Sequence, residues 1–423
     1  MSLNKAVPAQ DYIPFTEEMK REYTILVPMM LPMHFELIIN VFRNFGYKME
    51  LLRNTGSHIA DTGLHAVHND TCYPAILVIG QFLDALKSGN YDPHKTALML
   101  FQTGGGCRAS NYISLLRKAL KKEGYGYIPV ISFSFANIEK HPGFKITLPI
   151  FHKLLYALLY GDLLMTLYNQ CRPYEDEKGA ALRLAEQWTT RLADELAKGG
   201  FVSYRQVKEN YKKILDAFSA LPRTKRDAVR VGIVGEIFVK YSPLGNNDLE
   251  QFLVSEGAEP VVPGLLDFML YCFYDNLMDY RLYGISKRLY PVWRTVYGVC
   301  CKKKHDLIDV IRVHGEFTAP TPFEDVTTLT KNYIGNGAKM GEGWLLTAEM
   351  LELSRAGVGN IVCAQPFGCL PNHICGKGMM RPVKEHNPDV NIVAIDYDAG
   401  ATRVNQENRL KLMLANAKLK KQN

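Results

Sequence analysis

Short apolar runs alternate with amphipathic segments in two regions of the chain. Between about residues 23 and 132, strand-like runs such as "YTILVPM" and "TALMLFQ" alternate with helix-like patterns such as "ASNYISLLRKALKKEG". The same alternation resumes at "RVGIVGEIFV" (230–239) and continues towards the C-terminus. Continuous apolar runs of this length are typical of parallel strands that are covered by helices on both faces. The pattern predicts an α/β protein with two flavodoxin- or Rossmann-like parallel-sheet domains.

A helical period dominates the stretch between these two regions. The segment "GAALRLAEQWTTRLADELAKGG", for example, is amphipathic and ends in glycines, which commonly terminate helices. We therefore expect an N-terminal α/β domain over 1–146, a helical connector over 147–225 and a C-terminal α/β domain over 226–423. Helical patterns at about 264–315 predict an insertion within the C-terminal domain.

Composition narrows the class of protein. The 423 residues are too many for one ordinary core, and 47% hydrophobic with 22% charged residues is typical of a globular protein. The net charge of +7 comes from 50 basic and 43 acidic residues spread along the chain, so no nucleic-acid partner is expected. The start of the chain lacks a signal-peptide pattern, and His152, Lys153 and Asp162 interrupt the most apolar stretch. A cytoplasmic protein without a membrane partner is expected.

Three cysteines fall where loops of an open α/β sheet bind ligands. Cys72 precedes a helix-like pattern, while Cys107 and Cys369 follow strand-like runs. A helix N-terminus lowers the pKa of a cysteine and favours the thiolate, which binds metal or attacks electrophiles. Gly105 and Gly106 allow backbone N–H groups to approach the sulfur of Cys107 closely. Three soft ligands from distant loops suit an iron–sulfur cluster.

Other interpretations of these cysteines stay open from the residues alone. The string "GGGC" is reminiscent of a phosphate loop, but it lacks the Lys-Ser/Thr ending of one. Structural zinc would favour close CxxC pairs, of which the sequence has none. A catalytic cysteine would need an oriented histidine; His65, His68 and His373 are available, yet the sequence does not place them.

The six remaining cysteines are expected mainly to pack in cores. Four of them have helical, apolar surroundings: Cys171, Cys272, Cys300 and Cys301. Cys363 lies within the strand-like "NIVCA" and is expected to face inward, whereas Cys375 is equally compatible with a second ligand and a packed thiol.

Three further polar residues are candidates for catalytic work. Glu236 ends the strand-like "RVGIVGE" and is expected to position substrate, bond to a ligand or cap a helix. Arg108 follows Cys107 and would compensate the negative charge of a cluster or form a surface ion pair. His373 lies near Cys369 and would relay protons.

Several long strings resemble one protein family. They are "NDTCYPAILVIGQFLDALKSG", "QTGGGCRASNYISLLRKAL", "RVGIVGEIF", "NIVCAQPFGCLPNHICGKGM" and "NIVAIDYDAGATRVNQENRLKLML". They are similar to the 2-hydroxyacyl-CoA dehydratase B-subunit family, and more closely to the C-terminal half of the proteins known as acyl-CoA dehydratase activase-related. The wider superfamily includes benzoyl-CoA reductases and double-cubane cluster proteins.

The resemblance implies a cofactor and its partners. Cys72, Cys107 and Cys369 match the cluster cysteines of the family in chain order, and the cluster would be a 4Fe-4S cubane or an 8Fe-9S double cubane. A double cubane needs more thiolates, for which Cys363, Cys375 and Cys301 would be the candidates. Family members receive low-potential electrons from a separate ATP-hydrolysing activator that carries its own cluster. A second subunit or a homodimer, and an acyl-CoA substrate, are further implied partners.

The expected function follows from that family. It is oxygen-sensitive, reductive or radical chemistry at an iron–sulfur cluster, similar to 2-hydroxyacyl-CoA dehydration or to small-molecule reduction by a double cubane. The chain has no phosphate loop of its own, so ATP hydrolysis would take place on the activator. The alternative is a non-enzymatic electron carrier or cluster-assembly component.

Overall fold

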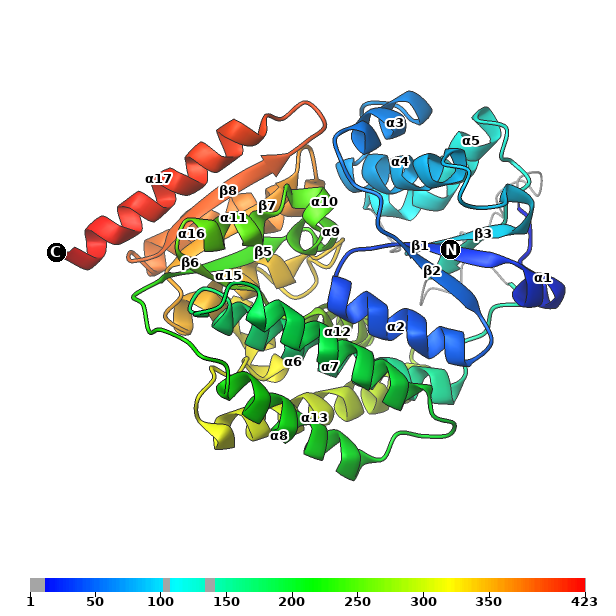
Figure 1. The fold of residues 1–423 in the computed structure, drawn as a ribbon. Helices are drawn as coiled ribbons and strands as arrows, with labels where there is room; N and C mark the ends of the chain where they lie inside the picture. The colour runs from blue at the N-terminus through cyan, green and yellow to red at the C-terminus, as the bar shows by residue number, and fades with distance from the viewer. Residues whose placement is uncertain (1–11, 102–106, 134–140, 423) are drawn as a thin grey trace. The chain divides into compact units, whose positions relative to one another are not determined.

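Contacts between residues divide the chain into two compact units. The computed structural model of the chain describes residues 12–101, 107–133 and 141–422. The first unit comprises Met1–Met29 and Phe42–Ile150, and the second comprises Met30–Val41 and Phe151–Asn423. Each unit contains one four-stranded sheet (Figure 1).

The sheet of the first unit is parallel throughout, with the strand order β2-β1-β3-β4. Its strands are β1 (Thr24–Pro28), β2 (Lys48–Leu52), β3 (Thr96–Phe101) and β4 (Val130–Phe133). The helices between them are α1 (Glu17–Glu22), α2 (Pro32–Asn44), α3 (His58–Ala66), α4 (Tyr73–Lys87) and α5 (Tyr112–Lys122). Strands β1 and β3 are buried over almost their whole length, as expected of parallel strands with both faces covered.

Two glycines allow α3 and α4 to touch backbone to backbone. A Cβ atom on Gly63 would lie 2.0 Å from the carbonyl oxygen of Ile76, and one on Gly80 would lie 2.0 Å from that of Ile59. Neither position accepts a side chain unless the helices separate. The glycines therefore fix the position of α4, and with it Cys72 at the start of that helix.

Replacing Gly80 by alanine should destabilise the first unit. The added methyl group forces α3 and α4 apart, and overpacking of this kind typically costs about 1–3 kcal/mol of unfolding free energy. Urea unfolding monitored by circular dichroism measures the loss. Gly298→Ala is the matched control, because Gly298 is a helical glycine with open space around it and alanine favours helix there. Equal stabilities of the two variants would contradict this account of the helix contact.

The sheet of the second unit repeats the order of the first. Its four parallel strands, in the order β6-β5-β7-β8, are β5 (Val229–Gly235), β6 (Ala258–Val261), β7 (Asn360–Pro366) and β8 (Asn391–Tyr397). Counted along the chain, both sheets run second, first, third, fourth. In such sheets the strand order reverses between the first and third strands, and ligands bind beyond the carboxyl ends of these two strands.

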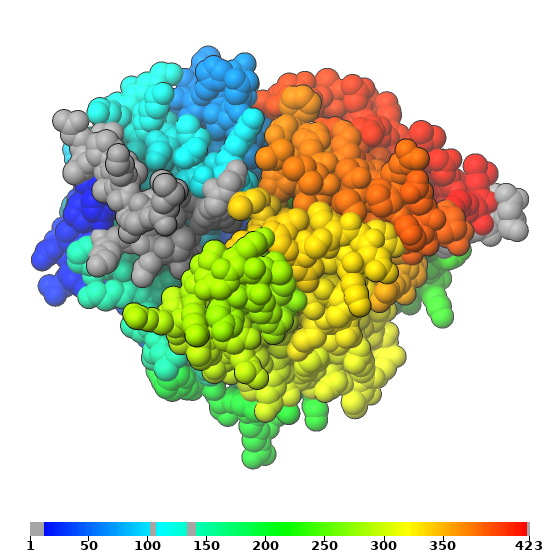
Figure 2. Space-filling model, turned by 180° about the vertical axis from the view of Figure 1, so that it is seen from behind, coloured from blue at the N-terminus to red at the C-terminus, as the bar shows by residue number. Residues whose placement is uncertain are grey.

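Helices surround this sheet and extend well beyond it. They are α6 (Leu148–Cys171), α7 (Ala180–Ala197), α8 (Tyr204–Ser219), α9 (Ile237–Tyr241), α10 (Pro243–Asn246), α11 (Leu249–Ser255), α12 (Leu265–Tyr283), α13 (Tyr290–His314), α14 (Phe323–Leu329), α15 (Trp344–Arg355), α16 (Met380–His386) and α17 (Arg403–Gln422). The turn between α12 and α13 lies at the surface, in yellow-green in Figure 2. Helices α7 and α8, expected as part of a connector, belong to the second unit by their contacts.

Helix α6 is long and apolar enough to cross a membrane, yet 67% of its most apolar window is buried inside the protein. Its charged side chains also have partners within the second unit. Lys153 is buried and donates a 2.8 Å hydrogen bond to the carbonyl of Leu196 in α7. The carboxylate of Asp162 accepts hydrogen bonds from the backbone N–H groups of Leu265 and Leu266 and so caps α12. These contacts place α6 in the core of the second unit.

Residues 30–41 of α2 belong to the second unit although the segments on either side belong to the first. His34 is fully buried, and its Nε2 lies 2.8 Å from Oδ1 of Asp162. Gly161 lies beneath the imidazole, since a Cβ atom there would lie 2.3 Å from Cδ2 of His34. The segment is therefore held on α6 by a specific polar contact.

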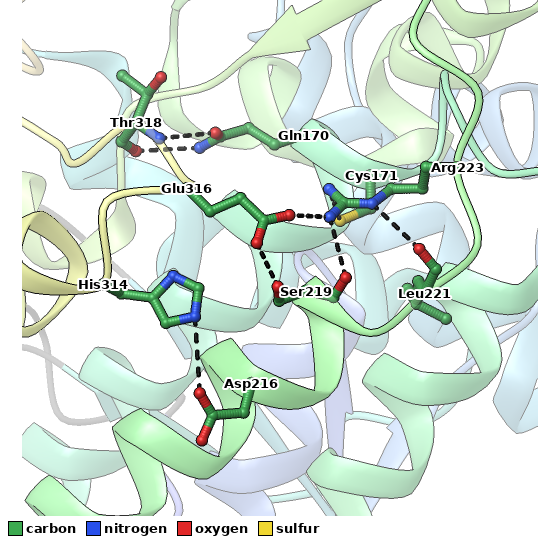
Figure 3. A network of polar contacts seen from close by, with 9 residues as sticks. All are labelled: Gln170, Cys171, Asp216, Ser219, Leu221, Arg223, His314, Glu316 and Thr318. Carbon is green, nitrogen blue, oxygen red and sulfur yellow. Dashed lines mark hydrogen bonds and ion pairs between the residues drawn. The ribbon is translucent and has the colours of Figure 1, made fainter.

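A polar network joins α6, the end of α8 and the segment after α13 (Figure 3). The guanidinium of Arg223 donates to the carboxylate of Glu316 and, at 3.4 Å, to the sulfur of Cys171. Gln170 and Thr318 form two hydrogen bonds with each other, of 2.9 and 3.0 Å. Cys171 is thus a buried structural thiol, as expected from its apolar surroundings.

The predicted fold class is confirmed. Both sheets are parallel and lie in the two regions where strand and helix patterns alternate in the sequence.

Candidate functional site

Cys72 is the N-cap residue of α4. Its backbone is not helical (φ −53°, ψ 132°), and Pro74 follows in the first turn, where its missing N–H group costs no hydrogen bond. Because α4 leads directly to β3, its N-terminus lies at the carboxyl edge of the sheet. Cys72 is mostly buried, and its sulfur accepts a 3.3 Å hydrogen bond from the hydroxyl of Tyr112.

Cys107 lies in the same corner of the first unit. It follows β3 and forms the N-cap of the short helix η2 (Arg108–Asn111), which leads into α5. Two contacts tie this segment to the loop of Cys72: Tyr112 bonds to the sulfur of Cys72, and Arg108 donates a 2.8 Å hydrogen bond to the carbonyl of Asp70. Cys107 itself is partly exposed. The first unit therefore presents two thiols on neighbouring loops.

Cys369 holds the corresponding place in the second unit. It follows β7, the third strand of its sheet, as Cys107 follows the third strand of the first sheet. Cys369 is 7% exposed, and its sulfur lies 3.4 Å from the amide nitrogen of Asn372. Burial raises the pKa of the Cys369 thiol, and the carboxylates of Glu342 and Glu236 add to the shift. Asn372 opposes the shift because it donates to the sulfur.

A pair of buried carboxylates lies at the end of β5, the first strand of this sheet. Glu236 is the N-cap of α9, and its Oε2 accepts a 2.8 Å hydrogen bond from the N–H of Val239. Oε1 of Glu342 accepts a 3.0 Å hydrogen bond from the N–H of Ile237 in the same turn. Burial, with the nearby charge of Glu342, raises the pKa of Glu236 to about 8. The pair therefore retains a proton at neutral pH.

Gly235 makes this arrangement possible. Its φ of +148° is favourable only for glycine, and a Cβ atom there would lie 1.8 Å from the carbonyl oxygen of Ala364 in β7. The backbones of β5 and β7 thus approach closely just before Glu236. Glu236 and Cys369 follow the two strands between which the strand order reverses, where ligands bind in such sheets.

Replacing Glu236 by glutamine should flatten the dependence of stability on pH. An ordinary carboxyl group has a pKa of about 4.3, so between about pH 4 and pH 8 the folded state binds a proton that the unfolded state releases. Stability from this group is present at low pH and is lost as pH rises towards 8. Glutamine still accepts from Val239, and the rise in pKa corresponds to at most about 5 kcal/mol, so the variant should gain a few kcal/mol over the native chain near pH 8.

Urea unfolding of the metal-free protein at several pH values measures this gain. Glu186→Gln, at an exposed position on α7, is the control and should leave the curve unchanged. A Glu236→Gln variant that loses stability between pH 4 and pH 8 as steeply as the native chain would contradict the raised pKa of Glu236.

The structure places the remaining residues predicted from the sequence as follows. His373 is partly exposed, and its backbone N–H bonds to the carbonyl of Cys369. Cys375 is buried in the turn η4 (Asn372–Gly376), and burial raises its pKa to about 11. Gly105 and Gly106 lie outside the described residues. Glu236 caps a helix, one of the three roles expected for it.

Two of the additional ligand candidates are packed thiols. Cys363 belongs to the core cluster of the second unit, with Val234 and Met350 among its members, and burial raises its pKa to about 12. Cys301 is buried on α13, where its described contacts are with Tyr297 and Glu324.

Sequence reasoning missed Glu342, Asn372 and Tyr112. Glu342 stands between two glycines in "MGEGW", directly before α15, and a charged residue in a glycine-rich loop is usually solvated. Its flanking glycines were the available signal, because Gly343 has a positive φ and no room for a Cβ atom beside the hydroxyl of Tyr271. The loop is shaped to turn Glu342 inward.

Comparison with protein-family models, curated proteins and solved structures found no match for the chain. Among the described residues, no group of three or more His, Cys, Asp or Glu side chains is placed to hold a metal ion. The family resemblance of the sequence therefore stays a prediction.

Proposed function

We propose that the chain is a cytoplasmic iron–sulfur protein whose cluster ligands are the thiolates of Cys72, Cys107 and Cys369. It would receive low-potential electrons from a separate ATP-hydrolysing activator and use them for reductive or radical chemistry on a bound substrate. The observation that carries the proposal is the repeated topology. Cys107 and Cys369 follow the third strand of two sheets with the same order, at the edge where parallel sheets bind ligands.

The hydrogen-bond donors around the thiols are of the kind found beside cysteine ligands of soft metals. A neutral donor faces two of the sulfurs, the hydroxyl of Tyr112 at Cys72 and the amide of Asn372 at Cys369. Donors of this type orient ligand sulfurs and tune the reduction potential of a cluster. Because burial raises the pKa of Cys369, its free thiol is a poor nucleophile at neutral pH, which weighs against thiol catalysis there. A bound cation would favour the thiolate.

Within this proposal the carboxylate pair serves proton transfer. A cubane held by three thiolates supplies low-potential electrons and one open, Lewis-acidic iron when it is bound. Glu236 and Glu342 are buried and keep one proton between them at neutral pH. Their negative charge contributes to the raised pKa of Cys369. A carboxyl group of raised pKa is able to donate that proton to a substrate group and later recover it.

A single cubane fits the thiols better than a double one. The double cubane needs further thiolates, and the candidates Cys363 and Cys301 are packed among apolar or aromatic neighbours. Cys375, in the turn η4 after Cys369, would be the one remaining candidate among the described residues. We therefore propose about four iron atoms per chain.

Anaerobic purification with iron and sulfide quantitation and EPR tests the proposal. About four irons per chain supports one cubane, and about eight supports the double cubane. A colourless chain that contains only zinc, or no metal after anaerobic reconstitution, would overturn it. If the loaded protein cycles between redox states but turns over no acyl-CoA with activator, ATP and reductant, the electron-carrier alternative is favoured.

A further inference from the structure

The turn between α12 and α13 exposes apolar side chains to an unusual extent. All nine residues from 281 to 289 are exposed, at the end of α12 and through the turn (Figure 2). We call residues 281–294 the tip. Five of its apolar side chains have at least half of their surface exposed: Leu282 50%, Tyr283 61%, Ile285 53%, Leu289 53% and Val292 55%. Large apolar side chains exposed together in one short segment indicate an interaction surface.

The tip is held in shape by its own hydrogen bonds. Gly284 ends α12 in the left-handed conformation, with φ of +67°, and its N–H bonds to the carbonyl of Tyr280 at 2.9 Å. The N–H groups of Leu289 and Tyr290 bond to the carbonyl of Ser286 and start the next helix. The rings of Tyr280 and Tyr290 lie 4.5 Å apart across the base of the turn. The apolar side chains are therefore presented by a fixed scaffold.

Four cations lie among these apolar side chains: Arg281, Lys287, Arg288 and Arg294. None of the four forms an ion pair with any residue that the structure describes. The one carboxylate nearby in the sequence, Asp279, is already paired with Lys339. The tip thus carries four positive charges that lack an ion-pair partner within the part of the chain that the structure describes.

We propose that the tip docks on the surface of an anionic lipid bilayer. The aliphatic side chains would enter the boundary between headgroups and acyl chains, and the four cations would meet lipid phosphates. Tyr283, and the partly exposed Tyr290 and Trp293, have the amphipathic rings that gather at the headgroup level. The contact is with the membrane surface, and it is independent of the proposed cluster chemistry. It departs from the expectation, drawn from the sequence, of no membrane partner.

Two observations favour a bilayer over a protein occupant. In a symmetric dimer the same patch faces itself, so four unpaired cations of one copy would oppose four of the other. Residues 281–283 are consecutive at the end of a helix, where successive side chains point to different sides, and all three are exposed. A fluid headgroup layer surrounds such a tip on every side, whereas a typical protein interface covers one broad face.

Vesicle co-sedimentation of the full chain tests the proposal. Vesicles of phosphatidylcholine mixed with phosphatidylglycerol should bind the chain, and vesicles of phosphatidylcholine alone should bind it much more weakly. The double variant Ile285→Ser with Leu289→Ser should weaken binding at least tenfold, because it removes two aliphatic side chains that would be buried in the bilayer. Arg288→Gln and Lys287→Gln should each weaken it about fivefold. Circular dichroism checks that the variants are folded.

The controls lie elsewhere in the second unit. Val313→Ser alters a side chain that is 88% exposed at the other end of α13, and Lys212→Gln removes an exposed cation from α8; both should bind as the native chain does. Binding that salt abolishes but Ile285→Ser with Leu289→Ser leaves intact would show only adsorption of a basic protein, and would overturn the proposal. A chain that binds neither kind of vesicle would also overturn the proposal. In that case, a dimer that Ile285→Ser dissociates would show that the tip binds a second copy of the chain. A monomer would instead indicate an acidic protein as the partner of the tip.

Discussion

Alanine at Cys107 or at Cys369 is expected to reduce the iron content of the anaerobically reconstituted chain from about four atoms to fewer than one. Each substitution removes one of only three proposed thiolates, and a cubane with two protein ligands is not held. Iron and sulfide quantitation, with the loss of the EPR signal of the reduced cluster, measures the result. A loss in both variants would show that each of the two thiolates is needed to hold the cluster.

Cys300→Ala is the matched control for these variants. Cys300 is buried on α13, where burial raises its pKa to about 12, and its removal should leave the iron content unchanged. If the Cys107→Ala and Cys369→Ala chains keep a full complement of iron and sulfide, the proposed ligand set is wrong. If Cys300→Ala loses iron as well, the losses report on folding rather than on ligation.

Methionine at Lys240 should cost about 3–5 kcal/mol of unfolding free energy. The ammonium of Lys240 and the carboxylate of Glu349 lie 2.8 Å apart, and each side chain is at most 3% exposed. Removing the cation leaves a buried carboxylate without a countercharge, and burial already raises the pKa of Glu349. Chemical denaturation of the Lys240→Met chain at neutral pH measures the loss.

A second substitution separates charge from packing at this pair. Combining Lys240→Met with Glu349→Met should recover much of the lost stability, since an apolar pair of similar volume often replaces a buried ion pair without penalty. Arg205→Met breaks an exposed pair with Glu209, 3.1 Å long, and should change the stability by at most about 1 kcal/mol. A double variant no more stable than Lys240→Met alone would contradict the electrostatic explanation.

The strands were predictable from the sequence because parallel strands are buried on both faces. Strands β3 and β7 contain the continuous apolar runs 97–101 and 361–364, and such runs need no knowledge of their neighbours to be recognised. The sequence revealed less about which segments belong to which of the two units. Residues 30–41 belong to the second unit, and one of their contacts there is that of His34 with Asp162, 128 positions away. No local pattern encodes a partner at that distance.

The candidate site divides in the same way. Placing Cys107 and Cys369 at strand ends needed only the positions of the strands, and both follow a strand as expected from their runs. That both strands are the third of their sheets emerged only from the structure. The inward turn of Glu342 depends on packing of its loop against Tyr271 and α9, which involves contacts between distant segments. Cys375, undecided from the sequence, is buried in the turn that follows Cys369.

The contact between His34 and Asp162 determines when residues 30–41 can complete their packing during synthesis of the chain. Chains emerge from the ribosome N-terminus first, and domains generally fold as units during that process. The strands of the first unit are complete at residue 133, but residues 30–41 gain their partner only after Asp162 has emerged. Until then a nascent chain exposes the side of α2 that later covers α6. A fragment that stops at residue 150 should therefore be prone to aggregation, whereas the full chain should not.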